Sequence, residues 1–422
     1  MTLEQELARA EPEQPDGACV RPDSRLDIVP LSVVRDGEEF VVGNLQSGIF
    51  VSVPEIAVVA LRQLQDGATV AEAGEAASRH AGQPVNVLEF VEALVEMGLV
   101  TAIDDRPLQH GSSEDVAWIE GLRPELARPF FSPAAWIVYG ALFAFSVATL
   151  AMRPELWPSF EDIFFYPNPA VSVVTVAAAS ILLTACHEAC HWLAARSAGV
   201  GARFRVSRRL FLPVFETDVS QLWSVPRGAR YGVFLAGMAF DTVVLATALA
   251  LRLLWMEGLV DLPPLVVRFL GAVVLLNVIG IGFQALIFLR TDLYAVLLTV
   301  LGCRNLYRVN FLLLKGKLRR LTPEERRELA DAHPRDHQVA RWFGFLYVFG
   351  LAWAAWYFVV IFVPGTVLLA GWMFHSIAGA PITSSSFWEA FSIGVVAALQ
   401  ALVPLVVFVR ERARARRVAA PR

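Results

Sequence analysis

Charge is scarce in this sequence of 422 residues, because only 18% of the residues are charged whereas 56% are hydrophobic. A soluble chain of this size needs more polar surface than that composition provides. The charged residues gather before about residue 128 and again between about residues 303 and 341. This distribution predicts a soluble N-terminal domain followed by a membrane domain.

The sequence also has few cysteines, no excess of positive charge and no recognisable secretory signal. The four cysteines, Cys19, Cys186, Cys190 and Cys303, are scattered or lie in apolar runs, so we expect no disulfide framework and a reducing compartment. A net charge of −4 gives no reason to expect nucleic-acid binding. The first stretch, MTLEQELARAEPEQPDG, has no apolar central region, which predicts an N-terminal domain that stays in the cytosol.

The N-terminal part has the pattern of a small α+β domain over residues 25–104, preceded by an expected disordered segment at 1–24. Short strands are predicted in LDIVPLSVVRD, EFVVGN and GIFVSV. Helices are predicted in PEIAVVALRQLQDG, TVAEAGEAASRHAG and VNVLEFVEALVEMGLV. This order of elements, with its "DG", "TVAE" and "LEFVEALVEMGLV" stretches, resembles the PqqD-like domain. The resemblance implies a winged-helix fold that binds leader segments of ribosomally made peptides.

Six apolar spans then predict a mainly α-helical polytopic membrane protein with about six transmembrane helices. A connector at 105–130, expected to contain a helix along the membrane surface, leads to a core at 131–302. A basic cytosolic helical segment at 303–341 and C-terminal transmembrane helices with a basic tail at 342–422 follow. The fifth span contains Pro364 and is expected to kink or re-enter. The spans are predicted near 131–152, 169–196, 229–256, 264–290, 342–374 and 388–409.

The loops between these spans differ in charge. Five arginines lie between the second and third spans and a sixth, Arg230, at the start of the third. The segment between the fourth and fifth spans is rich in arginine and lysine, and the tail reads RERARARR. The opposite loops contain one arginine and no lysine. The positive-inside rule therefore predicts a protein of the cytoplasmic membrane with both termini in the cytosol.

The stretch CHEACHW, residues 186–192, ends one of the most apolar runs of the chain. His187 and His191 are four residues apart, so on a helix they share one face and are suited to bind Zn²⁺. Glu188 is close enough to act as general base on a water at the metal. Ionisable residues inside a membrane span are costly and usually functional, which favours a metal site over satisfied core histidines.

A third ligand is required, and the remaining histidines lie in soluble segments or on the far side. Asp292, at the cytosolic end of the fourth span, is predicted to lie at a similar depth in the membrane to His187. Asp241, about three turns into the third span, is not excluded by depth alone. The residues themselves therefore leave two candidates for the third ligand.

Three stretches, taken in order, resemble the site-2 protease type of intramembrane zinc metallopeptidase, in its peptide-metalloprotease branch. They are HEACH, LPVFETDVSQLW followed by RYGVFLAG, and RTDLYAVLLTVLGCRNL. The resemblance covers residues 24–310 and implies that Asp292 is the third zinc ligand. It also implies a substrate-binding role for Gln284. Asp241 is expected to hydrogen-bond a ligand histidine or, equally, to link two helices.

This sequence departs from the family where Leu293 replaces the glycine after the ligand aspartate. The family's Asn-x-x-Pro is Gln284-Ala285-Leu286-Ile287 here, and its Ala-Gly-Pro is Ala236-Gly237-Met238. Two functions stay open on these residues. One is a zinc metalloendopeptidase that cleaves a membrane-associated or ribosomally made peptide recruited by the N-terminal domain. The other is a catalytically degenerate peptide-binding scaffold in peptide maturation, export or immunity.

Two further interpretations concern the rest of the membrane half. A histidine-rich membrane di-iron oxygenase is disfavoured, because the membrane half lacks the many histidines or carboxylates of such a site. The stretch RFRVSRRLFLPVF alternates in part and predicts a hairpin at the membrane edge. Its strand edge would pair with an unwound substrate, or the hairpin is simply a surface feature.

Overall fold

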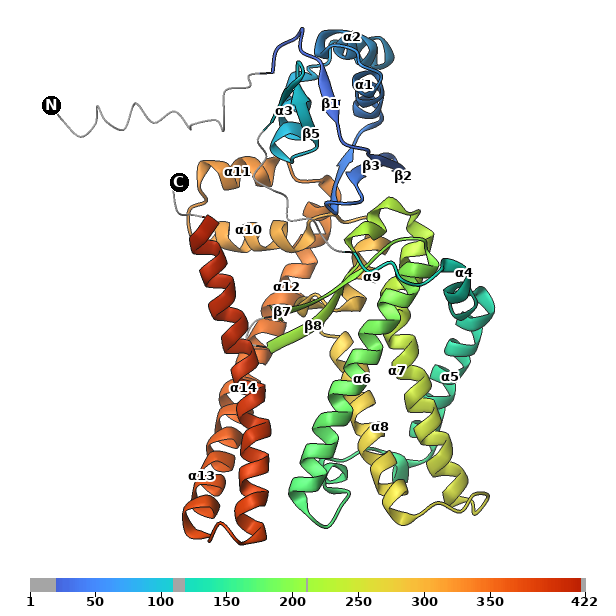
Figure 1. Cartoon of the computed structure of the whole chain (residues 1–422), viewed down its shortest axis with the longest axis vertical. Helices are drawn as coiled ribbons and strands as arrows, with labels where there is room; N and C mark the ends of the chain where they lie inside the picture. The colour runs from blue at the N-terminus through green and yellow to red at the C-terminus, as the bar shows by residue number, and fades with distance from the viewer. Residues whose placement is uncertain (1–19, 109–117, 210–211, 419–422) are drawn as a thin grey trace, which may run out of the picture. The chain divides into compact units, whose positions relative to one another are not determined.

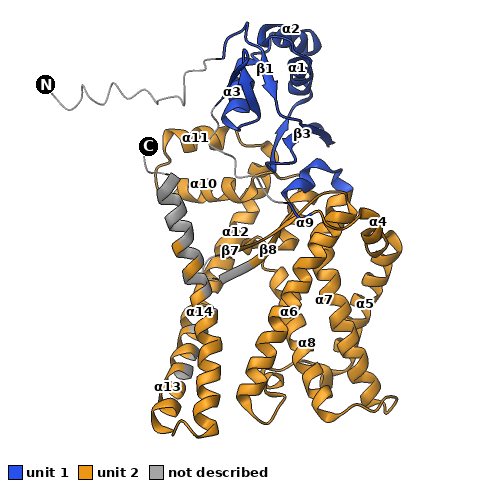
Figure 2. Ribbon diagram, viewed as in Figure 1, with its two compact units in different colours: residues 1–119, 220–228 blue, residues 120–219, 229–422 orange. Residues whose placement is uncertain are grey.

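The computed structural model describes residues 20–108, 118–209 and 212–418. The chain divides into two compact units (Figure 2). The first comprises residues 1–119 and 220–228, and the second comprises 120–219 and 229–422. Most of the expected disordered segment lies outside the described residues, but Val20 and Ser24 are buried. The ordered part of the first unit therefore begins before the predicted boundary at residue 25.

The strands of the first unit form two small sheets. β2 (Ser32–Asp36), β3 (Glu39–Asn44) and β4 (Ile49–Val53) make an antiparallel meander. β1 (Leu26–Ile28) instead pairs with β5 (Val100–Ile103), which also pairs with β6 (Arg106–Pro107). The predicted strand at 26–36 is thus two strands separated at Pro30, because a proline cannot donate to a sheet ladder.

Three helices pack with these sheets: α1 (Glu55–Gln65), α2 (Val70–Ala81) and α3 (Leu88–Glu96). Pro54 precedes α1, and Thr69 caps α2 in a capping box with Glu72. The third predicted helix is too long at its C-terminal end, since Gly98 takes a positive φ of 70° and β5 follows. Their apolar faces share one core with the sheets, in which Val42, Leu61, Leu64, Val91 and Leu94 are fully buried.

A segment from far along the chain completes the first unit. Residues 220–228 belong to it and contain a 3₁₀ helix, η4 (Ser220–Ser224). The Gln221 side-chain amide donates to the Leu45 carbonyl at 2.8 Å. Arg227 Nε lies 3.5 Å from Asp36 Oδ1. The predicted core domain at 131–302 is therefore interrupted by a segment that packs on the sheet of the N-terminal unit.

The second unit is mainly helical, and within its described residues five helices are long and apolar enough to cross a membrane (Figure 1). These are α5 (Pro133–Met152), α6 (Pro169–Ser197), α7 (Arg227–Met256), α8 (Pro264–Gln284) and α12 (Pro334–Tyr357), the last extended to Val360. The first four agree with predicted spans. The 3₁₀ helices η2 (Pro154–Leu156) and η3 (Phe160–Phe164) lie between α5 and α6.

The C-terminal spans differ from the prediction. α12 passes into a π-helical turn at Phe358–Phe362 and then into α13 (Val363–Gly379), which packs against α14 (Ser385–Val418). Pro364 follows the π turn directly, and its missing N–H accounts for the irregular hydrogen bonding there. Helix α14 runs through the whole of the sixth predicted span at 388–409. Its apolar part among the described residues is Ser385–Leu399, so the sixth span stays a prediction.

The predicted segment at 303–341 is helical over most of its length, and part of it is apolar. α9 (Asp292–Leu301) and α10 (Leu306–Leu318) are bent by 89° and together are apolar enough to count as a sixth candidate span. α11 (Pro323–Ala330) follows, capped by Thr322. Before α5, the expected connector helix is restricted to α4 (Pro124–Ala127) and η1 (Arg128–Phe131) within the described residues.

The predicted hairpin is present between α6 and α7. β7 (Arg203–Arg209) pairs antiparallel with β8 (Leu212–Asp218), with Arg203 opposite Asp218 and Phe204 opposite Thr217. β8 packs against α6, as Figure 1 shows. This contact brings the end of β8 to the helix that carries both predicted histidine ligands.

Candidate metal centre

Helix α6 presents His187 and His191 on one face, one turn apart, as their spacing predicts. Both residues are buried, with exposed fractions of 8% and 6%. The two imidazole rings are 5.0 Å apart between centroids. Each ring therefore needs a partner that satisfies its polar atoms away from water.

A stripe on α7 supplies those partners. The Asp241 carboxylate accepts a hydrogen bond from His187 Nδ1 at 2.8 Å, and the Val233 carbonyl accepts one from His191 Nδ1 at 2.7 Å. Gly237 lies between them, and a Cβ on it would come within 2.2 Å of His187 Nε2. Positions 233, 237 and 241 are successive turns of one helix face, so α7 holds both rings and leaves room for the first.

Asp292, the first residue of α9, completes the group. Its Oδ2 lies 3.1 Å from His187 Nε2 and 3.2 Å from His191 Nε2, and the two Nε2 atoms are 3.2 Å apart. Asp241 faces the opposite ring nitrogen of His187. Of the two candidates that the sequence leaves open, the structure therefore brings Asp292 to the Nε2 atoms and places Asp241 behind His187.

The three atoms have the chemistry and spacing of a metal site. Both Nδ1 atoms donate to acceptors, so a neutral imidazole at His187 or His191 presents only a lone pair at Nε2. Two lone pairs and a carboxylate oxygen then converge with no proton between them. Charging both rings instead would bury two cations side by side, which is costly. A cation held by His187, His191 and Asp292 resolves this conflict.

Zinc fits the spacing. Tetrahedral Zn²⁺ with bonds of about 2.0–2.1 Å places its ligand atoms about 3.3–3.4 Å apart. The three observed separations, 3.1, 3.2 and 3.2 Å, are slightly shorter than that value. Two neutral imidazoles with one carboxylate are also a ligand set that catalytic zinc accepts.

Gln284 lies at the end of α8 and contacts the ligand loop. Its Oε1 accepts a hydrogen bond from the Asp292 backbone N–H at 3.0 Å, and its carbonyl accepts one from the Thr291 hydroxyl at 2.7 Å. The side-chain oxygen of Gln284, a predicted substrate-binding residue, is therefore engaged in holding the start of α9. Its amide nitrogen is the part left for a substrate.

Glu188 points toward β8, where Thr217 meets it. The Thr217 backbone N–H and hydroxyl each lie 2.7 Å from Glu188 Oε2, and the hydroxyl also lies 2.9 Å from the Glu188 carbonyl. Thr217 and Gly237 lie in stretches that the sequence analysis compares with the family, but the sequence gives neither of them, nor the Val233 carbonyl, a role at the site. The spacing of Val233, Gly237 and Asp241 at intervals of four is the signal that could have found the stripe on α7.

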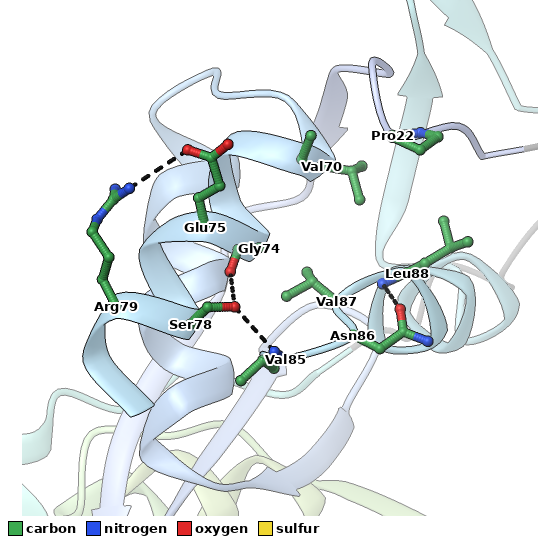
Figure 3. Close-up of a pocket in the computed structure, with 11 residues that line it drawn as sticks. Pro22, Val70, Gly74, Glu75, Ser78, Arg79, Val85, Asn86, Val87 and Leu88 are labelled. Atoms are coloured by element: carbon green, nitrogen blue, oxygen red, sulfur yellow. Dashed lines mark hydrogen bonds and ion pairs between the residues drawn. The ribbon is translucent and has the colours of Figure 1, made fainter. Parts of the chain in front are cut away.

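The first unit has a pocket of its own between α2 and α3 (Figure 3). Apolar groups of Val70, Val85, Val87 and Leu88 line much of it. An exposed ion pair, Glu75 with Arg79, stands on the α2 side. Its lining offers an apolar floor with charged groups beside it, and no cluster suited to catalysis.

Comparisons with protein-family models, with curated proteins and with solved structures find no match for this chain. The resemblances described above therefore stay expectations drawn from motifs. The functional interpretation depends on the arrangement of the side chains themselves.

Proposed function

We propose that this protein is a zinc metalloendopeptidase that cleaves a peptide bond at a site within the cytoplasmic membrane. One observation carries the proposal: two imidazole nitrogens of the long apolar helix α6 and a carboxylate oxygen at the start of α9 lie within 3.2 Å of one another. Glu188, next to the first ligand, supplies the carboxylate that peptide hydrolysis needs. The combination favours hydrolysis over a purely structural metal site, for which four protein ligands are usual.

His187, His191 and Asp292 would hold the zinc ion. When bound, zinc lowers the pKa of water and polarises a substrate carbonyl. Asp241 and the Val233 carbonyl keep a proton on each Nδ1, so both Nε2 lone pairs stay directed at the same point. Gln284 fixes the first turn of α9 through the Asp292 N–H, and this contact sets the position of the third ligand.

The proton-transfer role belongs to Glu188. Its carboxylate accepts a proton from the attacking water and then delivers it to the amine of the leaving peptide. A carboxylate performs both steps because its protonated form is a carboxylic acid that can donate. Asp292 is taken as a ligand and Asp241 is engaged behind His187, so Glu188, the neighbour of His187 in sequence, is the carboxylate to which we assign this role.

Membrane localisation is supported by the five or six helices that are apolar enough to span a bilayer. Arginine and lysine gather in the loop after α6, in the segment 303–341 and in the tail, which favours cytosolic termini. His187 then lies near the cytosolic end of α6. A peptide bound by the N-terminal unit on that side could be delivered to the site, and the apolar pocket of that unit is suited to an apolar side chain.

The test uses the purified full chain in detergent, one equivalent of Zn²⁺ and casein, an unfolded protein that offers many peptide bonds. We expect the wild-type chain to release casein fragments. Glu188→Ala is expected to bind the same amount of zinc and to release none. Equal fragment release by both proteins, or none by the wild-type chain with zinc bound, would count against the proposal.

A further inference from the structure

Thr217 contacts the proposed general base through two separate donors. Its backbone N–H and its hydroxyl both lie 2.7 Å from Glu188 Oε2. Within the part of the chain that the structure describes, no group donates to the other carboxylate oxygen, Oε1. The two oxygens of Glu188 therefore have different surroundings, one held by Thr217 and one without a donor.

The hairpin fixes Thr217 at this place. Thr217 lies opposite Phe204 in the register, and the next pair is Arg203 with Asp218. The Arg203 guanidinium donates to the buried Asp218 carboxylate at 2.8 Å, which ties the open end of the hairpin together beside Thr217. A charge-assisted bond at a buried acceptor is stronger than a neutral one. The strand end thus acts as a rigid support for the threonine.

The threonine hydroxyl has one proton but two nearby acceptors. Besides Oε2, it lies 2.9 Å from the Glu188 main-chain carbonyl. Hydrogen bonds to a charged acceptor are the stronger kind, so the proton goes to Oε2 when the carboxylate is ionised. The carbonyl contact is then not a hydrogen bond, because no proton remains between the two oxygens. Thr217 therefore holds Glu188 at Oε2, through its hydroxyl and its backbone N–H.

We propose that Thr217 is a positioning residue, which holds Glu188 by Oε2 and so directs Oε1 to the reacting water. This inference deepens the proposed peptidase function and rests on it. A glutamate side chain has considerable rotamer freedom, and ordering it before the reaction lowers the cost of reaching the transition state. Thr217 touches neither the metal ligands nor, in this role, the substrate.

Three variants of the full chain test the role with casein as substrate. Thr217→Val removes the hydroxyl but keeps the branched shape and the backbone N–H. We expect its kcat to fall about 10-fold to 100-fold, the value of a lost hydrogen bond to a charged group. Its KM and zinc content are expected to stay unchanged. Thr217→Ser, which keeps the hydroxyl, recovers most of the wild-type kcat.

Thr247→Val is the matched control. Thr247 lies on α7, is exposed, and donates only to the Val243 carbonyl of its own helix at 2.7 Å. The same chemical change there leaves kcat and KM as in the wild type. An unchanged kcat in Thr217→Val would overturn the proposal. So would a loss that Thr217→Ser does not recover, because the hydroxyl would then not be the active group.

A second measurement needs neither metal nor activity. The infrared difference between metal-free wild type and Glu188→Gln isolates the carboxylate band of Glu188, and the same difference in a Thr217→Val background isolates it without the hydroxyl. We expect the two bands to differ in frequency, since a carboxylate band responds to its hydrogen bonds. Identical bands would refute the contact with Thr217. Different bands in a protein that cleaves no casein would keep the contact and reject the peptidase.

Discussion

Gly237→Ala provides a sharp test of the metal centre. The added Cβ would lie 2.2 Å from His187 Nε2 and 2.5 Å from Cδ2 and Cε1 of the ring. Ordinary contact begins at 3.4 Å, so the ring must move by 3.4 − 2.2 = 1.2 Å, or α7 must retreat by as much. Metal sites tolerate deviations of about 0.2 Å, so His187 is lost as a ligand. Zinc affinity should fall by at least about 100-fold, beyond the effect of losing a supporting group.

The assay is a chelator competition that measures zinc affinity for the purified full chain. Alanine is more favourable than glycine in a helix by about 1 kcal/mol, so helix propensity alone predicts a more stable α7. Gly232→Ala, on the same helix, is the control, because its Cβ would meet Trp136 at an ordinary 3.7 Å. Wild-type zinc affinity in Gly237→Ala would refute the arrangement of His187 against α7.

Two further predictions concern a ligand support and an acid-sensitive contact. Asp241→Ala removes the acceptor of His187 Nδ1 and should weaken zinc binding about 10-fold to 100-fold in the same competition assay, and unchanged affinity would contradict its supporting role. In the first unit, the Arg25 N–H and the Ser24 hydroxyl hold the pKa of Asp104 below its ordinary 3.8. Because the folded pKa is the lower one, this carboxylate stabilises the fold above its ordinary pKa, and the contribution is lost as the pH falls through the folded value. Hydrogen exchange at the Arg25 amide, corrected for its intrinsic rate, should therefore lose protection on acidification in the wild type, and the difference should be absent in Asp104→Asn.

Local patterns were sufficient for much of the fold. Periodicity located α1, α2 and the first four long helices, because amphipathic spacing and apolar length are properties of a short window. The predictions fail where distant segments decide the structure. β5 exists because β1, far along the chain, pairs with it, and η4 joins the first unit because Gln221 reaches Leu45. Both contacts join residues far apart in the sequence, so neither produces a local sequence pattern that would predict it.

The same distinction applies to the site. His187 and His191 follow from helix geometry, since residues four apart share a face. Asp292 could be proposed only by depth and by resemblance, because its position depends on how α8 ends and α9 begins. Thr217 was missed for a different reason: nothing in a strand sequence shows which helix its edge will meet. The sequence thus located the three side chains that converge, together with Asp241 behind His187, but not Thr217 beside Glu188.

The residues that differ from the resembled family lie at the end of α8 and the start of α9, where the structure shows what they do. Leu293, which stands where the resembled family has a glycine, lies in the regular first turn of α9. The left-handed conformation falls instead on Arg290, with φ of 59°, whose guanidinium lies 3.7 Å over the Tyr307 ring. A cation–π contact of this kind contributes about 0.5–2 kcal/mol, which is comparable to the cost of a non-glycine residue in that region.

The proline of the family's Asn-x-x-Pro is also absent here, where Ile287 takes its place, and other contacts close this segment. α8 ends at Gln284 without it, and the Thr291 hydroxyl satisfies the Gln284 carbonyl that the helix end leaves without an intrahelical partner. The Gln284 side chain then binds the Asp292 N–H, so the same residue closes the loop from both its backbone and its side chain. A degenerate site would have no need to keep Asp292 within 3.2 Å of both imidazole nitrogens through such substitute contacts. The altered loop therefore keeps the three side chains in a geometry that could hold a metal ion, which is what the proposed function requires.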